Sequence, residues 1–199
     1  MSSARTTYDP IAMTLHWLMA IAIIALLLIG WTMTGDSIDS STRETFFVWH
    51  KSMGVVIFFA ALFRLFWRSR HEPPPEPASL EAGEIMLAQT THMLLYAFLI
   101  LQPLTGWMLS SVMPYKTQFF GFFIIPDLFF MPSYDTAVGT WLSSFLKNLH
   151  GFLGSAFAIL LVVHIGAALK HHFLTRDAVL FRMAPVWAAP LLKKLRHEK

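Results

Sequence analysis

Four long apolar segments, separated by shorter polar stretches, dominate the pattern of this 199-residue chain. They cover residues 11–33, 46–67, 85–112 and 145–170. Each reaches the roughly 20 residues that an apolar helix needs to cross a hydrocarbon core about 30 Å thick. We therefore predict an all-α integral membrane four-helix bundle that forms one domain over residues 1–199. The first segment is too long for a signal-peptide core and has no small-x-small cleavage site, so we expect it to be retained.

Two connectors between these segments carry signals of their own. Residues 68–84 include three consecutive prolines at 73–75 and predict a stiff, solvated link. Residues 113–144 contain two aromatic stretches, 119–125 and 128–130, that are too short to span and are separated by a proline and an aspartate. We predict a short interfacial helix over the outer end of the bundle. Such a helix serves either as a lid on an outer cofactor or as a plain membrane anchor.

The composition excludes several classes of protein. Hydrophobic residues make up 55% of the chain and charged residues 14%, whereas soluble domains carry about a quarter charged residues. The chain has no cysteine, which excludes disulfides, iron–sulfur clusters, thiolate ligation of heme and covalent heme attachment. Any iron must therefore be held by histidine or methionine. We expect no nucleic-acid partner, because the basic residues cluster at the edges of the apolar segments, where they face lipid headgroups.

The distribution of lysine and arginine predicts the orientation of the chain. One set of ends carries Arg5, Arg64, Arg68, Arg70, Lys170, Arg176, Arg182, Lys193, Lys194, Arg196 and Lys199. The opposite set carries only Arg43, Lys51, Lys116 and Lys147. Because cytoplasmic loops are enriched in lysine and arginine, we expect both termini in the cytoplasm.

Four histidines fall at two matched depths in this topology. His150 and His164 are fourteen residues apart on the fourth segment, about 21 Å along one face of a helix. His50 lies near the outer depth and His16 near the inner depth. Neutral imidazole is favoured at low dielectric and is the form that binds iron. The pattern predicts two stacked hemes, held by His50 and His150 on the outside and by His16 and His164 on the inside.

Small residues follow these four histidines by four positions, where they share a helix face and leave room for a flat porphyrin. They are Ala20, Gly54, Gly154 and Ala168. His92 is followed instead by Tyr96, so we predict that His92 does not bind iron. We expect it to line an inner quinone site or to form a hydrogen bond near the inner heme. His171 and His172, at the inner boundary, are further candidates for quinone or propionate contacts.

Basic residues are expected near both the outer and the inner pair of histidines. Arg64 lies fourteen residues after His50, at the level of the inner heme. It is either a snorkelling topology residue or a partner for a heme propionate or a quinone carbonyl. Arg43, Lys51 and Lys147 surround the outer pair, where they hold propionates, attract small anions to a positive mouth, or form a solvated rim.

With these residues in place, the chain resembles the bacterial cytochrome b561 family, which comprises four-span, di-heme b proteins of the inner membrane. The resemblance extends over nearly the whole chain. It rests on Leu15-His16-Trp17, His50–Gly54, His92 with Leu101–Gly106, His150-x13-His164, Lys170–Phe173 and Leu180–Pro185. In that family the two histidines of the fourth helix serve different hemes, with partners on the first and second helices. The resemblance implies a multi-pass protein of the bacterial inner membrane.

Within the family the chain looks like the stand-alone branch that passes electrons from superoxide to ubiquinone. Arg43 and Lys147, seven and three residues before the outer histidines, resemble the basic surroundings of the outer heme in that branch. The resemblance implies two heme b groups, ubiquinone as electron acceptor, and superoxide and membrane lipid as partners. Arg43, Lys51 and Lys147 would steer superoxide or contact the propionates.

Two other functions remain open on this sequence. One is an electron-transfer cytochrome b subunit of a membrane dehydrogenase or hydrogenase complex, which depends on a redox partner protein. The short loops and the lack of a large docking segment favour the superoxide oxidase over this subunit. The other is a heme-free scaffold or transporter, which would show no Soret absorbance.

Overall fold

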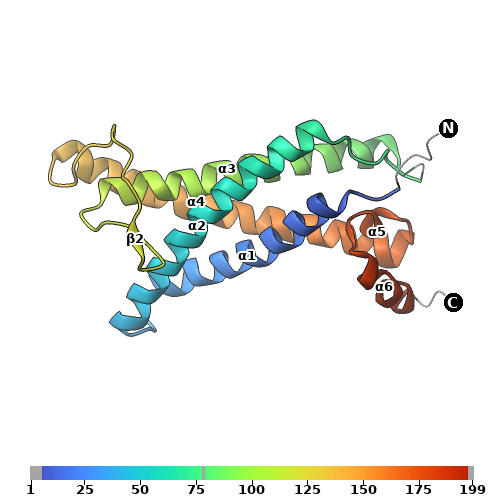
Figure 1. Cartoon of the computed structure of the whole chain (residues 1–199), viewed down its shortest axis with the longest axis horizontal. Coiled ribbons are helices and arrows are strands. Elements are labelled where there is room, and N and C mark those ends of the chain that lie inside the picture. Colours follow the sequence, from blue (N-terminus) through green and yellow to red (C-terminus); the bar gives the residue numbers. More distant parts are fainter. Residues whose placement is uncertain (1–5, 78, 197–199) are drawn as a thin grey trace.

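The computed structural model describes residues 6–77 and 79–196 and is mostly helical. Four long helices run side by side along the molecule (Figure 1). They are α1 (Pro10–Thr34), α2 (Ser40–Arg70), α3 (Ala82–Val112) and α4 (Ala137–Lys170). Each of the four is long and apolar enough to cross a membrane. For the fourth, the span includes the helical continuation of α4 to Thr175. The four predicted spans are therefore confirmed.

The helices are longer than the apolar segments because polar residues extend and cap them. Helix α2 begins at Ser40 rather than near residue 46, since the carboxylate of Asp39 accepts a hydrogen bond from Thr42 N–H at 3.0 Å. Hydrogen bonds from Ser41 and Thr42 hold the pKa of Asp39 below its ordinary value. Helix α4 begins eight residues earlier than its predicted span, where Thr136 caps Gly139 N–H.

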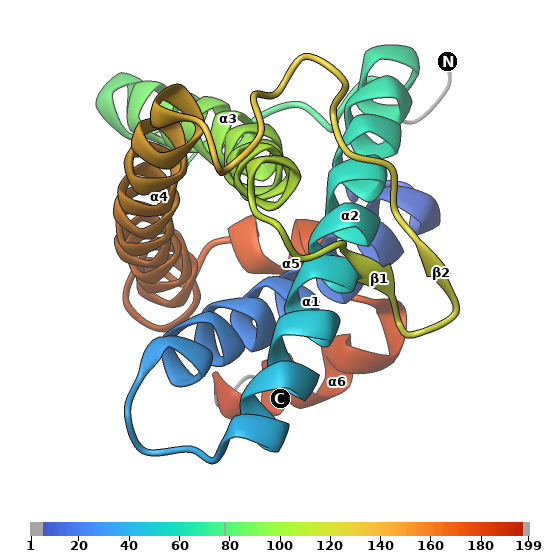
Figure 2. The same cartoon turned by 90° about the vertical axis from the view of Figure 1, so that its left-hand side faces the viewer.

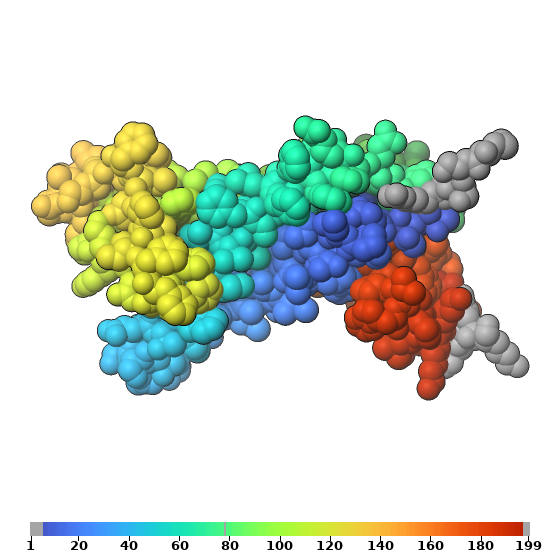
Figure 3. Space-filling view, viewed as in Figure 1, coloured from blue at the N-terminus to red at the C-terminus, as the bar shows by residue number. Residues whose placement is uncertain are grey.

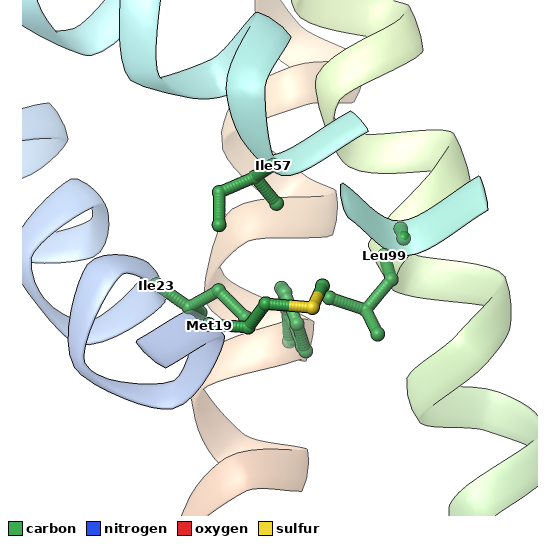
Figure 4. Packing of buried hydrophobic residues seen from close by; sticks show 6 residues of the cluster. Met19, Ile23, Ile57 and Leu99 are labelled. Atoms are coloured by element: carbon green, nitrogen blue, oxygen red, sulfur yellow. The ribbon is translucent and has the colours of Figure 1, made fainter. Parts of the chain in front are cut away.

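Helices that are neighbours in the chain pack on one another around the bundle. Seen from the end in Figure 2, α4, α3, α2 and α1 come in that order, and α1 packs on α2, α2 on α3, and α3 on α4. Side chains from all four helices meet in one buried cluster halfway along the bundle (Figure 4). The cluster consists of Met19, Ile23, Ile57, Ala61, Leu99 and Phe157.

The connector between α3 and α4 contains a β-hairpin, so the prediction of a short helix there is wrong. Strands β1 (Gln118–Phe119) and β2 (Phe123–Ile124) pair antiparallel. The turn needs left-handed backbone at Phe120 (φ 49°) and Gly121 (φ 83°), which interrupts a right-handed helix. The hairpin is attached to α2, because Phe120 N–H donates to Ser52 Oγ at 2.8 Å.

The chain after α4 forms a compact unit at the opposite end from the hairpin (Figure 3). Helix α4 continues as a π-helical turn (His171–Thr175), followed by α5 (Val179–Met183), a 3₁₀ turn (Val186–Ala188) and α6 (Ala189–Leu195).

Arg182 joins this unit to the rest of the bundle end that the charge pattern predicts to be the inner one. It donates to the carboxylate of Glu76 at 2.7 Å, and its carbonyl accepts from Tyr8 N–H at 3.0 Å. The start of α1, α5 and α6 lie at the same end of the bundle (Figure 1). Arg5 and Lys199, whose charges contribute to the predicted orientation, lie outside the described residues.

Candidate heme-binding site

The outer histidines come together as the sequence predicts. The ring centroids of His50 on α2 and His150 on α4 are 6.1 Å apart, with 82° between the ring planes. Metal–imidazole bonds are about 2 Å long. With each ring centre roughly 1 Å behind its nitrogen, two imidazoles that share one metal ion have centroids about 6 Å apart. The spacing therefore suits two axial ligands of one iron.

His150 is held by residues of α3. Thr105 Oγ1 lies 3.1 Å from His150 Nδ1, and Gln102 Nε2 donates to the His150 carbonyl at 3.0 Å. Gly106 lies directly against the ring, since a Cβ there would come within 2.9 Å of His150 Cε1. A side chain at position 106 would therefore displace the imidazole.

His50 is held by packing. Its Nδ1 is buried, and the Leu26 backbone of α1 with which His50 interacts lies outside full hydrogen-bond geometry. Its ring lies against Gly30 of α1, where a Cβ would approach Cε1 to 3.1 Å. Gly54, one turn after His50, faces open space, which agrees with the room predicted beside the ligand. Gly154 instead faces the amide of Gln102, at 3.1 Å from a Cβ built there.

The inner histidines form a second cluster. The ring centroids of His16 on α1 and His164 on α4 are 6.2 Å apart, with 67° between their planes. His92 of α3 is as close, with its centroid 5.5 Å from that of His164. Tyr96 packs beneath Arg64, whose guanidinium carbon is 5.9 Å from the ring centre. The structure thus brings together the two predicted ligands and a third imidazole. That His92 does not bind iron stays a prediction.

Arg64 lies at the inner cluster, as its spacing from His50 predicts. Its Nη2 is 3.4 Å from His16 Nδ1, and its Nη1 donates to the Ala12 carbonyl at 3.2 Å. A half-buried guanidinium beside an imidazole pair is suited to an anionic or carbonyl oxygen of a bound group.

The three outer cations differ in their surroundings. Arg43 donates to the carbonyls of Met33 and Gly35, at 3.2 and 2.9 Å, and so ties the end of α1 to α2. Lys51 is half-buried and Lys147 is exposed, and among the described residues neither forms an ion pair. Lys147 is therefore the outer cation most free to act on solutes.

The two histidines that follow α4 have separate surroundings. His171 Nδ1 lies 2.6 Å from the carboxylate of Asp177. Burial would raise the pKa of Asp177, but hydrogen bonds from Val179 N–H and His171 outweigh it and hold this pKa below its ordinary value. The ring of His172 is buried against Phe181, with centroids 5.6 Å apart. Neither of its nitrogens has a partner in the described part of the chain.

Sequence reasoning did not assign roles to several residues that contact the outer imidazoles. Thr105 and Gln102 lie within the Leu101–Gly106 stretch that carries the resemblance, but no spacing rule indicated that they touch His150. Gly30 and Gly106 were likewise not singled out. Contacts between helices depend on how each helix is rotated, which a single sequence pattern does not report.

The donors present fit heme iron better than a free metal ion. Each cluster offers imidazole nitrogens from different helices. Within residues 6–77 and 79–196, no group of three or more His, Cys, Asp or Glu side chains is arranged to hold a metal ion. Heme supplies four equatorial nitrogens of its own and needs only two axial ligands from the protein. Paired imidazoles, with open space at Gly54 beside the outer pair, meet that requirement.

Comparisons with known proteins agree with this chemistry. A family model described as prokaryotic cytochrome b561 matches residues 7–185. Two relatives from Escherichia coli K12, Cytochrome b561 homolog 2 and homolog 1, are 28% and 29% identical over 177 and 175 residues. These matches cover 88% and 86% of this chain and 90% and 93% of the relatives. A Yersinia pestis protein named Probable superoxide oxidase CybB is 24% identical over 185 residues, covering 89% of this chain and 96% of that protein.

Proposed function

The chain belongs to the prokaryotic cytochrome b561 family, and from that premise we propose that it is a di-heme b cytochrome that oxidises superoxide and reduces ubiquinone. Proteins of this family bind heme b and transfer electrons in membranes. The observation that carries the proposal is the presence of two imidazole pairs in one bundle, with centroid separations of 6.1 and 6.2 Å.

His50 and His150 would hold the outer heme, and His16 and His164 the inner one. When bound, heme b supplies one-electron chemistry, because its iron alternates between the ferric and ferrous states. His150 and His164 of α4 would separate the two pairs by about 21 Å along the helix axis. The apolar cluster around Phe157 lies between the pairs and gives that region apolar surroundings.

The polar residues around the pairs have distinct proposed tasks. Lys147 and Lys51 give the outer end a positive potential that attracts a small anion. Arg43 contributes its charge from the turn between α1 and α2 that it holds closed. Arg64 offers a donor to a heme propionate or a quinone carbonyl at the inner pair. His92, His171 and His172 are the inner candidates for quinone or propionate contacts.

The overall reaction balances with two protons taken from water and no other oxidant or reductant. Two superoxide anions each lose one electron and become dioxygen. One ubiquinone gains those two electrons and two protons and becomes ubiquinol. We propose that both termini face the cytoplasm of the bacterial inner membrane, so that superoxide meets the end with the hairpin. The inner end, with Arg64 and His92, supplies groups that can hold the quinone oxygens or the protons.

Two observations support superoxide as the donor. One relative is named a probable superoxide oxidase, although at only 24% identity. In addition, Lys147 is exposed close to the outer pair and forms no ion pair within the described residues. The competing function is a cytochrome b subunit that receives electrons from a partner protein.

The test uses the purified full chain in detergent micelles, with no other protein present. We expect a pyridine hemochrome assay to give two hemes per chain, superoxide to reduce them, and a soluble ubiquinone analogue to reoxidise them. Reduction only after addition of a dehydrogenase or hydrogenase partner would replace this proposal with the subunit function. Lack of Soret absorbance would overturn both.

A further inference from the structure

The hydroxyl of Thr105 lies against Nδ1 of His150, one of the two nitrogens that can carry the imidazole proton. Thr105 is buried on α3, with 7% of its surface exposed. Its hydroxyl donates to the carbonyl of Gln102 at 2.9 Å, and its oxygen lies 3.1 Å from His150 Nδ1. A hydroxyl has a single proton. When that proton goes to the Gln102 carbonyl, the contact with His150 is made by Nδ1–H, which donates to Thr105 Oγ1. In that arrangement the lone pair of the neutral imidazole is on Nε2.

Gln102 holds the backbone of the same histidine. Its amide nitrogen donates to the His150 carbonyl at 3.0 Å. The same nitrogen is 3.4 Å from His150 Nε2, which is long for a hydrogen bond and leaves the lone pair available. Gly154 makes this position possible, because a Cβ there would lie 3.1 Å from the Gln102 amide. Thr105 thus contacts the ring of His150, and Gln102 holds its backbone.

The opposite ligand has weaker support. The interaction of His50 with the Leu26 backbone lies outside full hydrogen-bond geometry, and the His50 ring is positioned by packing against Gly30. The outer pair is therefore asymmetric. The His150 imidazole contacts hydrogen-bonding side chains of α3, whereas the His50 imidazole is held mainly by packing.

We infer that Thr105 and Gln102 are positioning residues that set the orientation and the donor strength of the His150 imidazole toward the outer heme iron. The inference rests on the proposed binding of heme at this pair. An imidazole that donates its N–H becomes a more basic ligand, and such partners of metal-bound histidines change metal affinity by about 10–100-fold when removed. A more basic axial ligand favours ferric iron, so Thr105 lowers the reduction potential of the outer heme.

The closing experiment compares Thr105→Ser with Thr105→Ala in the purified full chain. These two variants differ only in the hydroxyl, so any loss of packing is common to both. Potentiometric titration and electron paramagnetic resonance of the ferric hemes are the readouts. In Thr105→Ala we expect a roughly tenfold larger ferrous-to-ferric ratio of one heme at fixed ambient potential, equivalent to a midpoint about 59 mV higher. Its low-spin g values should change as well, while the second heme stays unchanged.

Thr105→Ser should titrate like the parent protein, because it keeps the acceptor oxygen. Ser155→Ala is a matched control: it removes a hydroxyl of α4 that bonds the Gly151 carbonyl at 3.1 Å on the exposed face, and should leave both hemes unchanged. Gln102→Leu should alter the g values of the same heme as Thr105→Ala.

Equal potentials and g values in Thr105→Ser and Thr105→Ala would overturn the inference while leaving the heme assignment intact. A parent protein without two bis-histidine hemes would overturn the proposed function itself, so the two failures are distinguishable.

Discussion

Phe157 stacks on Phe98, with ring centroids 5.4 Å apart and 6° between the planes. Phe157 is seven residues from His150 and seven from His164, so this aromatic pair lies midway between the two imidazole clusters. Only 4% of the surface of Phe157 is exposed. The stack joins α3 to α4 at the buried apolar cluster in the middle of the bundle.

Replacing Phe157 with alanine should destabilise the bundle without removing a ligand. Burial of an aromatic ring and its stacked contact make a large-to-small change costly, by about 3 kcal/mol. Thermal unfolding in detergent micelles should show a clear fall in the midpoint. Ile159→Ala is the matched control, because Ile159 is 67% exposed on the same helix. A similar fall in both variants would contradict the assignment of Phe157 to the core.

Alanine variants of the histidines should separate ligands from neighbours. Loss of His50 or His150 should remove or alter one heme, and loss of His16 or His164 the other, because each leaves an open axial position. Heme content by pyridine hemochrome and low-temperature difference spectra report this directly.

The informative variant at the inner cluster is His92→Ala. We expect it to retain both hemes and to reduce quinone more slowly. Since the His92 ring lies 5.5 Å from that of His164, loss of one heme in this variant, with heme content normal in His16→Ala, would show that the inner ligands are His92 and His164.

Apolar pattern and spacing predicted much of this molecule. The spans follow from hydropathy, and the pairing of His50 with His150 and of His16 with His164 follows from equal depth on helices of known rise. The predicted starts of α2 and α4 were wrong by up to eight residues. The caps at Asp39 and Thr136 determine these starts, and the polar first turns that follow them are not recognised by hydropathy.

The other differences between the predicted and the observed structure arise from local backbone conformation or from contacts between helices. The hairpin depends on left-handed backbone at Phe120 and Gly121, which outweighs the aromatic pattern of the connector. Contacts such as Thr105 with His150 depend on the rotation of α3 against α4. The periodicity of apolar residues along one helix gives no information about how that helix is rotated against its neighbour.

Asp9 should make the inner end of the bundle sensitive to acid. Its carboxylate caps α1 by accepting from Ile11 and Ala12 N–H, both at 3.0 Å, and accepts from Trp67 Nε1 at 3.0 Å. Burial would raise the pKa of Asp9, but these hydrogen bonds hold it below the ordinary 3.8. A depressed pKa contributes stability above pH 3.8, and this contribution is lost as the pH falls through the folded value.

Asp9→Ala should therefore lower stability at pH 7 by about 1 kcal/mol, a typical value for a lost helix cap. The difference from the parent protein should shrink as the pH approaches 3. Asp9→Asn keeps the acceptor oxygen but does not titrate, so thermal unfolding of this variant should lack the acid-dependent component. A constant difference between Asp9→Ala and the parent from pH 7 to pH 3 would rule out a contribution from the ionised carboxylate.

Charge reversal at Lys147 tests whether the outer end attracts superoxide. The side chain is exposed three residues before His150, and cations near a reactive centre raise the encounter rate of small anions in a salt-dependent way. Lys147→Glu should lower the second-order rate of heme reduction by superoxide and weaken or invert its dependence on ionic strength, with heme content unchanged. Arg43 is less suitable, because removing its bonds to the Met33 and Gly35 carbonyls would also disturb the turn.

Lys193→Glu is the matched control, since Lys193 is an exposed cation on α6 at the opposite end of the bundle. It changes the net charge by the same amount but should leave the superoxide rate as it is. Both variants should be reduced normally by quinol supplied at the inner end. If the superoxide rate is the same in the parent and Lys147→Glu at every ionic strength, electrostatic steering by Lys147 is wrong. In that case the function as an electron-transfer subunit, reduced by a protein partner, becomes the better account of the outer pair.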